Sequence, residues 1–186
     1  MLMHCVNVFA AVSSHWGTFL LFYQYPVFSL CIMGISIHSI VSYDLMFWGG
    51  SSKTWMERVF RHQKKALRII CGMKHSESCR GAFPAEDILT LSCMYIYSIS
   101  VFVFENSHLF PLPSHSYPTR NNDLLKLPKF KHSLTCKSFM FLAPKIFNSL
   151  PNNIKCAGSS RQFKLKIRSF LSEGAYYTLD EFFDRL

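Results

Sequence analysis

The residue types that could carry catalysis occur in this chain without the spacing that catalysis needs. The chain has 186 residues, with eight histidines and seven cysteines, but no nucleophile-elbow, phosphate-loop or His-Glu-x-x-His pattern. It also has no Asp-Asp pair, and its acidic pairs Glu86-Asp87 and Asp180-Glu181 are placed as helix-start charges rather than as ligands of two metal ions. The residues therefore indicate no enzyme active site and no cofactor.

One cluster contains potential zinc ligands. Cys71, His75 and Cys79 follow each other at intervals of four, and Cys93 could be a fourth ligand. This spacing matches no common structural zinc pattern, so no metal site is predicted. The odd number of cysteines and the lack of a Cys-x-x-Cys pair argue against a secreted disulfide framework and favour free thiols in a reducing compartment.

The clearest chemical signal is a group of cations on one side of a predicted helix. The helix can be capped by Ser51 or Ser52 and closed by Gly72, and no Gly or Pro lies between them. At about 100° per residue, the apolar side chains take one arc of this helix and the cations the opposite arc. The cations are Arg58, Arg61, Lys64, Lys65 and Arg68. Glu57 cannot neutralise all of them, so the surplus charge suits a polyanion, although a merely solvated face is the alternative.

Gln63 falls inside the apolar arc of the same helix. An amide in that position needs hydrogen-bond partners, because burying it without them costs free energy. We therefore expect Gln63 to bond to a neighbouring loop.

Weaker candidates for nucleic-acid contact lie further along the chain. Ser159 or Ser160 can cap a second basic amphipathic helix that Gly174 closes. Its candidate residues are Lys164, Lys166 and Arg168. Arg120 lies in a loop beside an aromatic residue and amides, a combination that can contact a nucleic-acid backbone or stabilise its own turn.

The charge distribution divides the chain into two parts. The formal net charge is +9, yet residues 1–43 contain no Asp, Glu, Lys or Arg. We predict an apolar N-terminal segment over residues 1–35 and a helical region over residues 36–186. Residues 17–37 are long enough to cross a bilayer, but Pro26 lies near their centre and no basic residue flanks them, which argues against a membrane span.

The remaining patterns predict a mainly α fold, an irregular helical domain of about five helices. A helix ends before Gly49-Gly50, an apolar helix runs from Ala85 to about Glu105 after Pro84, and a long Pro-rich loop covers residues 106–131. Further helices are predicted around residues 139–150 and after Thr178. Pro144 either starts or kinks the first of these, and Asn148 is interpreted as a capping residue.

Eight short strings occur in an order that resembles a known family. They are Tyr43-Asp44-Leu45-Met46-Phe47-Trp48-Gly49, Gln63-Lys64-Lys65-Ala66-Leu67-Arg68, Ser78-Cys79-Arg80 with Phe83, Ile88-Leu89-Thr90-Leu91, Tyr117 with Thr119-Arg120-Asn121, Phe147-Asn148-Ser149-Leu150-Pro151, Phe163-Lys164 and Glu181-Phe182. Together they resemble the C-terminal region, thumb and beyond, of the reverse transcriptases of non-LTR (LINE-type, jockey-like) retrotransposons. The resemblance covers about residues 36–186; Asp44 stands where the family usually has Gly.

The resemblance implies a non-catalytic fragment of an RNA-directed DNA polymerase. The family's catalysis belongs to a palm domain whose aspartates hold two metal ions, including an aromatic-Ala-Asp-Asp motif that this chain lacks. The implied partners are the RNA and DNA backbones of template and primer, together with the missing palm and fingers domains, and the implied location is intracellular, nuclear or cytoplasmic. The alternatives are a small protein anchored in a membrane by residues 17–37 and a degenerate reading frame without function.

Overall fold

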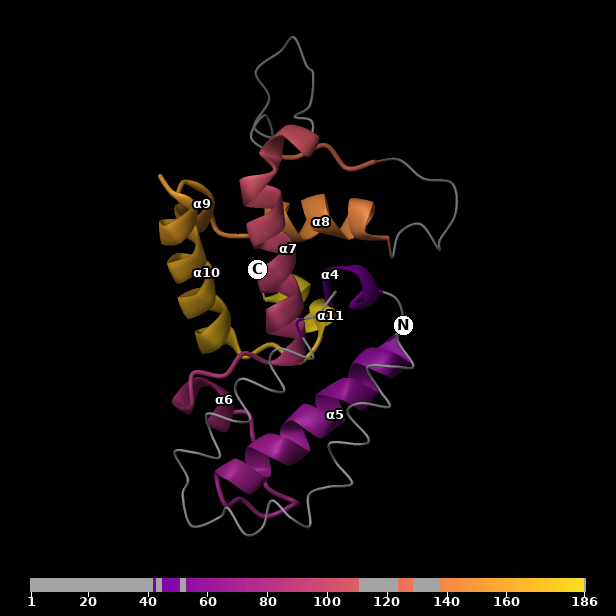
Figure 1. Cartoon of the computed structure of the whole chain (residues 1–186), viewed down its shortest axis with the longest axis vertical. Coiled ribbons are helices and arrows are strands. Elements are labelled where there is room, and N and C mark those ends of the chain that lie inside the picture. Colours follow the sequence, from indigo (N-terminus) through magenta and orange to yellow (C-terminus); the bar gives the residue numbers. More distant parts are fainter. Residues whose placement is uncertain (1–41, 43–44, 51–52, 111–123, 129–137, 186) are drawn as a thin grey trace.

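The computed structural model describes residue 42 and residues 45–50, 53–110, 124–128 and 138–185 (Figure 1). The elements are α4 (Leu45–Trp48), α5 (Lys53–Ile70), α6 (Ala82–Ala85), α7 (Leu91–Glu105), the 3-10 turn η2 (Ser107–Leu109), α8 (Phe139–Asn148), α9 (Asn152–Lys155), α10 (Ser160–Gly174) and α11 (Leu179–Asp184). These ranges contain no strand, which confirms the mainly α prediction. The predictions for residues 1–41 and for Arg120 lie outside the described residues, and so does the alternative of a membrane anchor at residues 17–37.

Helix α7 runs through the middle of the described helices (Figure 1). It is apolar nearly all round, and α4, α5, α8 and α10 all pack against it. Tyr95, Ile96 and Ile99 are fully buried within it. Because such a helix has no polar face to leave in water, it must be covered on every side. The helix predicted for the aromatic and β-branched stretch is confirmed.

The beginning of α7 differs from the prediction. The helix starts at Leu91 rather than at Ala85, and Thr90 is its N-cap, accepting a hydrogen bond on its side chain from the Cys93 amide. The residues after Pro84 do not continue into α7, because Asp87 has a φ of 50°, which a right-handed helix does not allow. The acidic pair that resembled a first helical turn therefore forms the corner between α6 and α7.

The predicted ends of the other helices are mostly confirmed. Gly72, with a φ of 62°, closes α5, and the Met73 amide donates to the Arg68 carbonyl at 2.8 Å. Ser159 and Thr178 cap α10 and α11 through their side chains. The C-terminus of α10 was predicted one residue early, because Ala175 rather than Gly174 takes the left-handed conformation that ends the helix.

Helix α8 corrects the interpretation of Asn148. Its side-chain oxygen accepts from the Leu125 amide at 2.8 Å, and its side-chain nitrogen donates to the Leu125 carbonyl at 2.9 Å. Asn148 therefore does not cap α8 but fastens residues 124–128 to it. Pro144 lies inside α8 and so does not start the helix.

Gln63 ties α5 to the beginning of α7. It is 5% exposed; its Nε2 donates to the Leu89 carbonyl at 2.8 Å, and its Oε1 accepts from the Leu91 amide at 2.9 Å. The expectation that Gln63 bonds to a neighbouring loop is confirmed. The two bonds fix the rotation of α5 about its axis, because the amide can reach both backbone groups from one orientation only.

Replacing Gln63 by leucine tests this clamp. Gln63→Leu leaves the Leu89 carbonyl and the Leu91 amide buried without their partner, so we expect the free energy of unfolding to fall by about 2–3 kcal/mol. Urea denaturation followed by circular dichroism measures the change. Gln162→Leu on α10 is the matched control: its side chain bonds the Gly158 amide at an exposed site, where water replaces the lost bond. Equal losses in both variants would contradict the clamp.

Candidate nucleic-acid interface

The cations of α5 divide into two groups. Arg58, Arg61 and Lys65 are exposed, and within the described part of the chain none of them forms an ion pair. Glu57 lies four residues before Arg61, and it likewise forms no ion pair in that part. The opposite face of the helix is buried, with Val59, Phe60, Gln63, Ala66 and Leu67 turned inward. These three cations therefore stand on the outer face, as the helical pattern predicts.

Lys64 and Arg68 are half-buried at the edge of this face. The Lys64 ammonium lies 4.7 Å from the centre of the Phe60 ring and 5.5 Å from that of Tyr177. The Arg68 Nε donates to the Glu77 carbonyl at 3.1 Å. Both side chains keep their positive charge but have contacts within the protein, so they are less available to a ligand than the three outer cations.

The pKa of His62 is affected by two cations of the outer face. Burial is the main cause that lowers the pKa of His62 below its ordinary value of 6.5, and Lys65 and Arg61 lower it further. A cation disfavours a second positive charge beside it, so the two neighbouring cations act on the pKa of His62 in the same direction as burial. An anion bound to the same cations would act on the pKa of His62 in the opposite direction.

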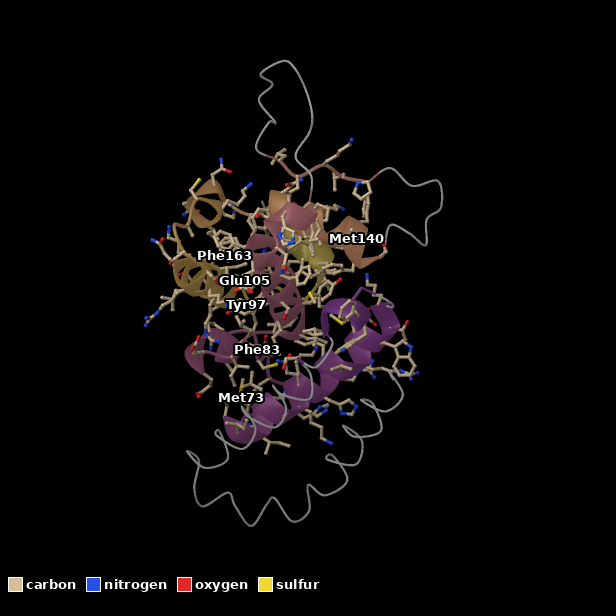
Figure 2. All side chains as sticks on the ribbon, turned by 45° about the horizontal axis from the view of Figure 1, so that its top comes forward. Met73, Phe83, Tyr97, Glu105, Met140 and Phe163 are labelled. Carbon is tan, nitrogen blue, oxygen red and sulfur yellow. The ribbon has the colours of Figure 1, made fainter. Side chains whose placement is uncertain are left out.

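The cations predicted on α10 are bound to other parts of the protein. The Lys164 Nζ lies 2.7 Å from Glu105 Oε1, and this hydrogen bond raises the pKa of Lys164. Figure 2 shows the end of α7 at Glu105 together with Phe163, whose ring stacks on Phe104 with centres 4.3 Å apart. The α10 residues thus join two helices.

Two further cations of α10 are also bound to other parts of the protein. Arg168 Nη2 lies 2.9 Å from Asp87 Oδ2 and also donates to the Asp87 carbonyl, while Lys166 Nζ donates to the Asn153 carbonyl at 3.0 Å. Of the nine residues predicted to bind nucleic acid, the structure thus leaves Arg58, Arg61 and Lys65 as the exposed cations without such a partner in its described part. Arg120 is not among the described residues.

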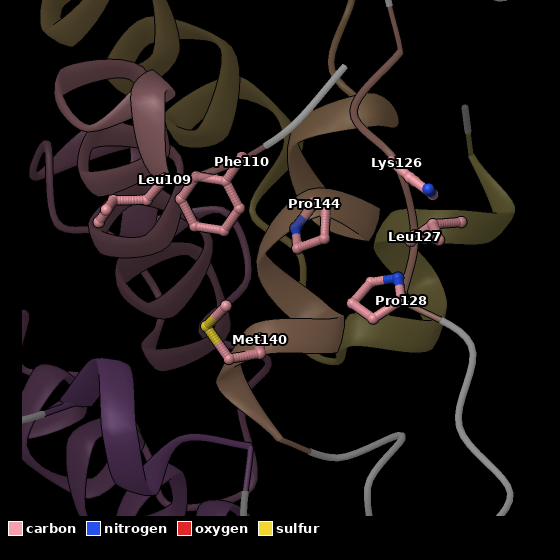
Figure 3. A pocket seen from close by; sticks show the side chains of 7 residues that line it. All are labelled: Leu109, Phe110, Lys126, Leu127, Pro128, Met140 and Pro144. Atoms are coloured by element: carbon pink, nitrogen blue, oxygen red, sulfur yellow. The ribbon is translucent and has the colours of Figure 1, made fainter. Parts of the chain in front are cut away.

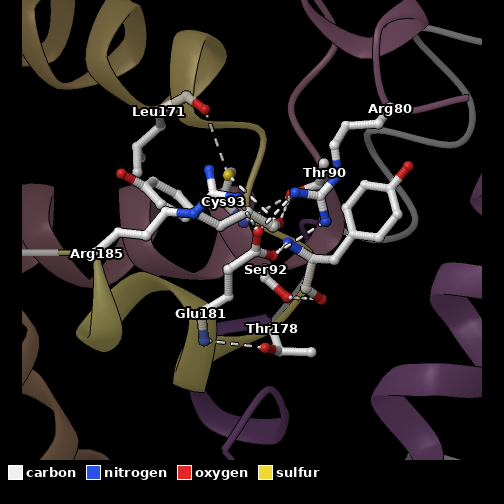
Figure 4. Close-up of polar contacts among 10 residues, drawn as sticks. Arg80, Thr90, Ser92, Cys93, Leu171, Thr178, Glu181 and Arg185 are labelled. Carbon is white, nitrogen blue, oxygen red and sulfur yellow. Dashed lines mark hydrogen bonds and ion pairs between the residues drawn. The ribbon is translucent and has the colours of Figure 1, made fainter.

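A network of polar and ring contacts joins residues that are far apart in the sequence and reaches α5 through Tyr177 (Figure 4). Arg80 binds Glu181 through both terminal nitrogens, at 2.6 and 3.2 Å, and Arg185 binds the same carboxylate at 2.7 Å. The Arg80 guanidinium also lies 4.2 Å from the centre of the Tyr177 ring, which packs on Phe60 of α5. Arg80 and Glu181 lie in separate strings of the sequence, and the sequence analysis did not predict that they pair. Their opposite charges were the feature that could have indicated the contact.

The segment between α10 and α11 crosses the beginning of α7. The Thr90 hydroxyl donates to the Tyr176 carbonyl at 2.5 Å, and the Ser92 hydroxyl donates to the Tyr177 carbonyl at 2.9 Å (Figure 4). Since Gln63 binds the same end of α7, helix α5 and the C-terminal segment are fastened to one point.

The cysteines considered as potential zinc ligands have other contacts. Among the described residues, no group of three His, Cys, Asp or Glu side chains is placed to hold a metal ion. The Cys79 thiol lies 3.9 Å from the Tyr177 hydroxyl, and the buried Cys93 thiol donates to the Leu171 carbonyl. Burial raises the pKa of Cys93. These thiols pack within the core.

A pocket lined mainly by apolar side chains lies in another region of the protein. This apolar pocket of about 590 Å³ lies beside α8, and no residue of α5 lines it (Figure 3). Its lining residues are Leu109, Phe110, Lys126, Leu127, Pro128, Met140 and Pro144.

No helix in the described residues has the length and apolar character needed to cross a membrane.

The described part of the chain is mainly helical, and α5 presents a cationic face outward. Comparison with protein-family models, with curated proteins and with solved structures finds no match for this chain. The resemblance to the C-terminal region of reverse transcriptases therefore stays a prediction based on the ordered strings.

The Arg80–Glu181 contact predicts how stability depends on pH. The bond from Arg80 is the main cause that holds the pKa of Glu181 below its ordinary value of 4.5. A carboxylate with a lowered pKa in the folded state stabilises the fold fully above its ordinary pKa, and this contribution is lost as the pH falls through the lowered value. We expect Glu181→Gln to cost about 1–2 kcal/mol at neutral pH, and progressively less as the pH falls below 4.5 through the lowered pKa of Glu181.

Denaturant unfolding at several pH values measures this difference. Glu173→Gln, which removes an exposed carboxylate of α10, is the matched control. A Glu181→Gln variant whose loss of stability is the same at both ends of the pH range would argue against the ion pair.

Proposed function

We propose that this chain is a non-catalytic nucleic-acid-binding unit, similar to the C-terminal region of non-LTR retrotransposon reverse transcriptases. Its α5 binds the phosphate backbone of RNA and DNA, the template and primer strands of the family it resembles. The observation that carries the proposal is that Arg58, Arg61 and Lys65 are exposed without an ion pair in the described part, while the other face of the same helix is buried.

The spacing of the cations suits a nucleic-acid strand. Arg58, Arg61, Lys65 and Arg68 follow each other at intervals of three or four residues, which places them in one row along the helix. At a rise of 1.5 Å per residue the row is about 15 Å long, comparable with the length of about four successive phosphates on one strand of a duplex. Contacts of this kind are to the backbone, so binding is expected to be independent of base sequence.

The contacts of the resembling strings support a structural unit rather than a reaction centre. Gln63, Arg80, Asn148 and Glu181 come from four different strings, and each binds a distant segment of the chain. The sequence has no Asp-Asp pair for a two-metal site. These strings therefore hold helices together around α7, and polymerase chemistry would need the palm domain of a partner.

Salt dependence tests the proposal. Titrating a labelled RNA–DNA duplex with the full chain, followed by fluorescence anisotropy, should give a slope of log affinity against log salt of about −3, because about three or four phosphates are neutralised. We expect Arg58→Gln, Arg61→Gln and Lys65→Gln together to remove most of the affinity and most of the slope. An affinity that does not change with salt would contradict the proposal.

The matched control removes the same charge from α10. The triple variant Lys164→Gln, Lys166→Gln and Arg168→Gln should lose stability, because it breaks the contacts to Glu105, Asn153 and Asp87, yet keep most of the affinity for the duplex. If both triple variants lose affinity equally, net charge rather than the α5 face determines binding. Extension of a primer by the purified chain would contradict the non-catalytic part of the proposal.

Binding should also depend on pH through His62. The free protein holds the pKa of His62 below 6.5 through burial and through Lys65 and Arg61, and a phosphate bound to these cations offsets their effect. The bound state then takes up a proton, so affinity should rise severalfold between about pH 7.5 and about pH 5.5.

The same anisotropy titration at several pH values measures this linkage. His62→Gln should flatten the pH profile, while His75→Gln, at an exposed position in the turn after α5, should leave it as in the parent. A profile that stays steep in His62→Gln would show that another group takes up the proton.

A further inference from the structure

Trp55 stands at the border between the two faces of α5. It lies in the first turn of the helix and is only half-buried, whereas Val59, Phe60 and Leu67 are at most 8% exposed. Within the described part of the chain, its indole is not one of the side chains that build the hydrophobic core or pack against it. The position therefore has a large aromatic ring that core packing does not explain.

Trp55 is in line with the cation row. Trp55, Arg58, His62 and Lys65 follow at intervals of three and four residues, so two planar rings alternate with two cations along one side of α5. The carbon at the centre of the Arg58 guanidinium lies 5.0 Å from the centre of the Trp55 ring. This contact holds the indole beside the exposed cation that begins the row.

The chemistry of this arrangement fits an unpaired nucleobase. Proteins that bind single strands combine cations that follow the backbone with aromatic or guanidinium planes on which bases stack. A base inside a duplex is already stacked between its neighbours and offers no free face. An aromatic ring at one end of a cation row therefore distinguishes a single strand from a duplex.

We propose that Trp55 is a base-stacking position, and that α5 binds a single-stranded stretch of nucleic acid with its phosphates on Arg58, Arg61 and Lys65 and one base on the Trp55 indole. This inference rests on the proposed function and adds to it the kind of strand that binds. The stacking contribution persists at salt concentrations that weaken the phosphate contacts, because stacking releases no counterions.

The competing explanation is that Trp55 and Arg58 form only a local pair on the helix surface. Such a pair would stabilise α5 slightly and would make no distinction between ligands with and without bases. The two explanations therefore differ in a measurable way, provided that the two ligands carry the same number of phosphates.

The experiment compares two single-stranded DNA probes of equal length, an oligothymidylate and an oligomer of abasic nucleotides, bound to the full chain in an anisotropy titration. We expect the oligothymidylate to bind about fivefold to tenfold more tightly, which corresponds to stacking of one base. Trp55→Ala should bind both probes with the affinity that the parent shows for the abasic probe. Trp55→Phe, which keeps an aromatic plane, should retain most of the preference.

Arg61→Gln is the control for backbone contacts. It should weaken both probes by the same factor and leave their ratio unchanged. A parent chain that binds both probes equally, or a Trp55→Ala variant that keeps the preference, would overturn the stacking position while leaving salt-dependent backbone binding intact. Failure of the parent to bind either probe or the RNA–DNA duplex would overturn the proposed function as well.

Discussion

The beginning of α7 is the point to which the other helices are fastened. Because α7 is apolar nearly all round, burial alone would let its neighbours slide or turn against it, since the hydrophobic effect has no direction. Hydrogen bonds supply the direction: Gln63 binds the backbone on either side of Thr90, and Thr90 and Ser92 bind the carbonyls of the segment before α11. The orientation of α5, and with it the outward direction of its cations, follows from this arrangement.

The same packing explains why the cations singled out on α10 and those on the outer face of α5 have different surroundings. Helix α10 lies along α7, so its Lys164 meets Glu105 at the end of α7, and its Arg168 meets Asp87 at the corner before α7. Helix α5 packs against the beginning of α7, where Gln63 binds Leu89 and Leu91, and it presents no acidic partner to Arg61 among the ion pairs of the described part. The acids of neighbouring elements thus distinguish Lys164 and Arg168 of α10 from the three outer cations of α5.

The features that the sequence could predict are those set by neighbouring residues. The faces of α5, the caps at Ser159 and Thr178, and the need of Gln63 for partners all depend on patterns a few residues long. The features that it could not predict depend on partners far along the chain, such as the contact of Arg80 with Glu181, 101 residues apart. The start of α7 was misplaced because Pro84 and the acids after it form a plausible first turn, and the competing cap, Thr90, lies only a few residues further on.

One six-residue string links the family resemblance with the cationic face of α5. In Gln63-Lys64-Lys65-Ala66-Leu67-Arg68, the first, fourth and fifth residues are buried, and Lys65 is exposed. The clamp that Gln63 makes and the burial of Leu67 hold this part of the helix in one rotation, so the direction of Lys65 is a consequence of the core contacts. Residues of one short string thus contribute to the core and also determine the direction of an exposed cation. The string therefore predicts the outer face of α5 as well as its buried face.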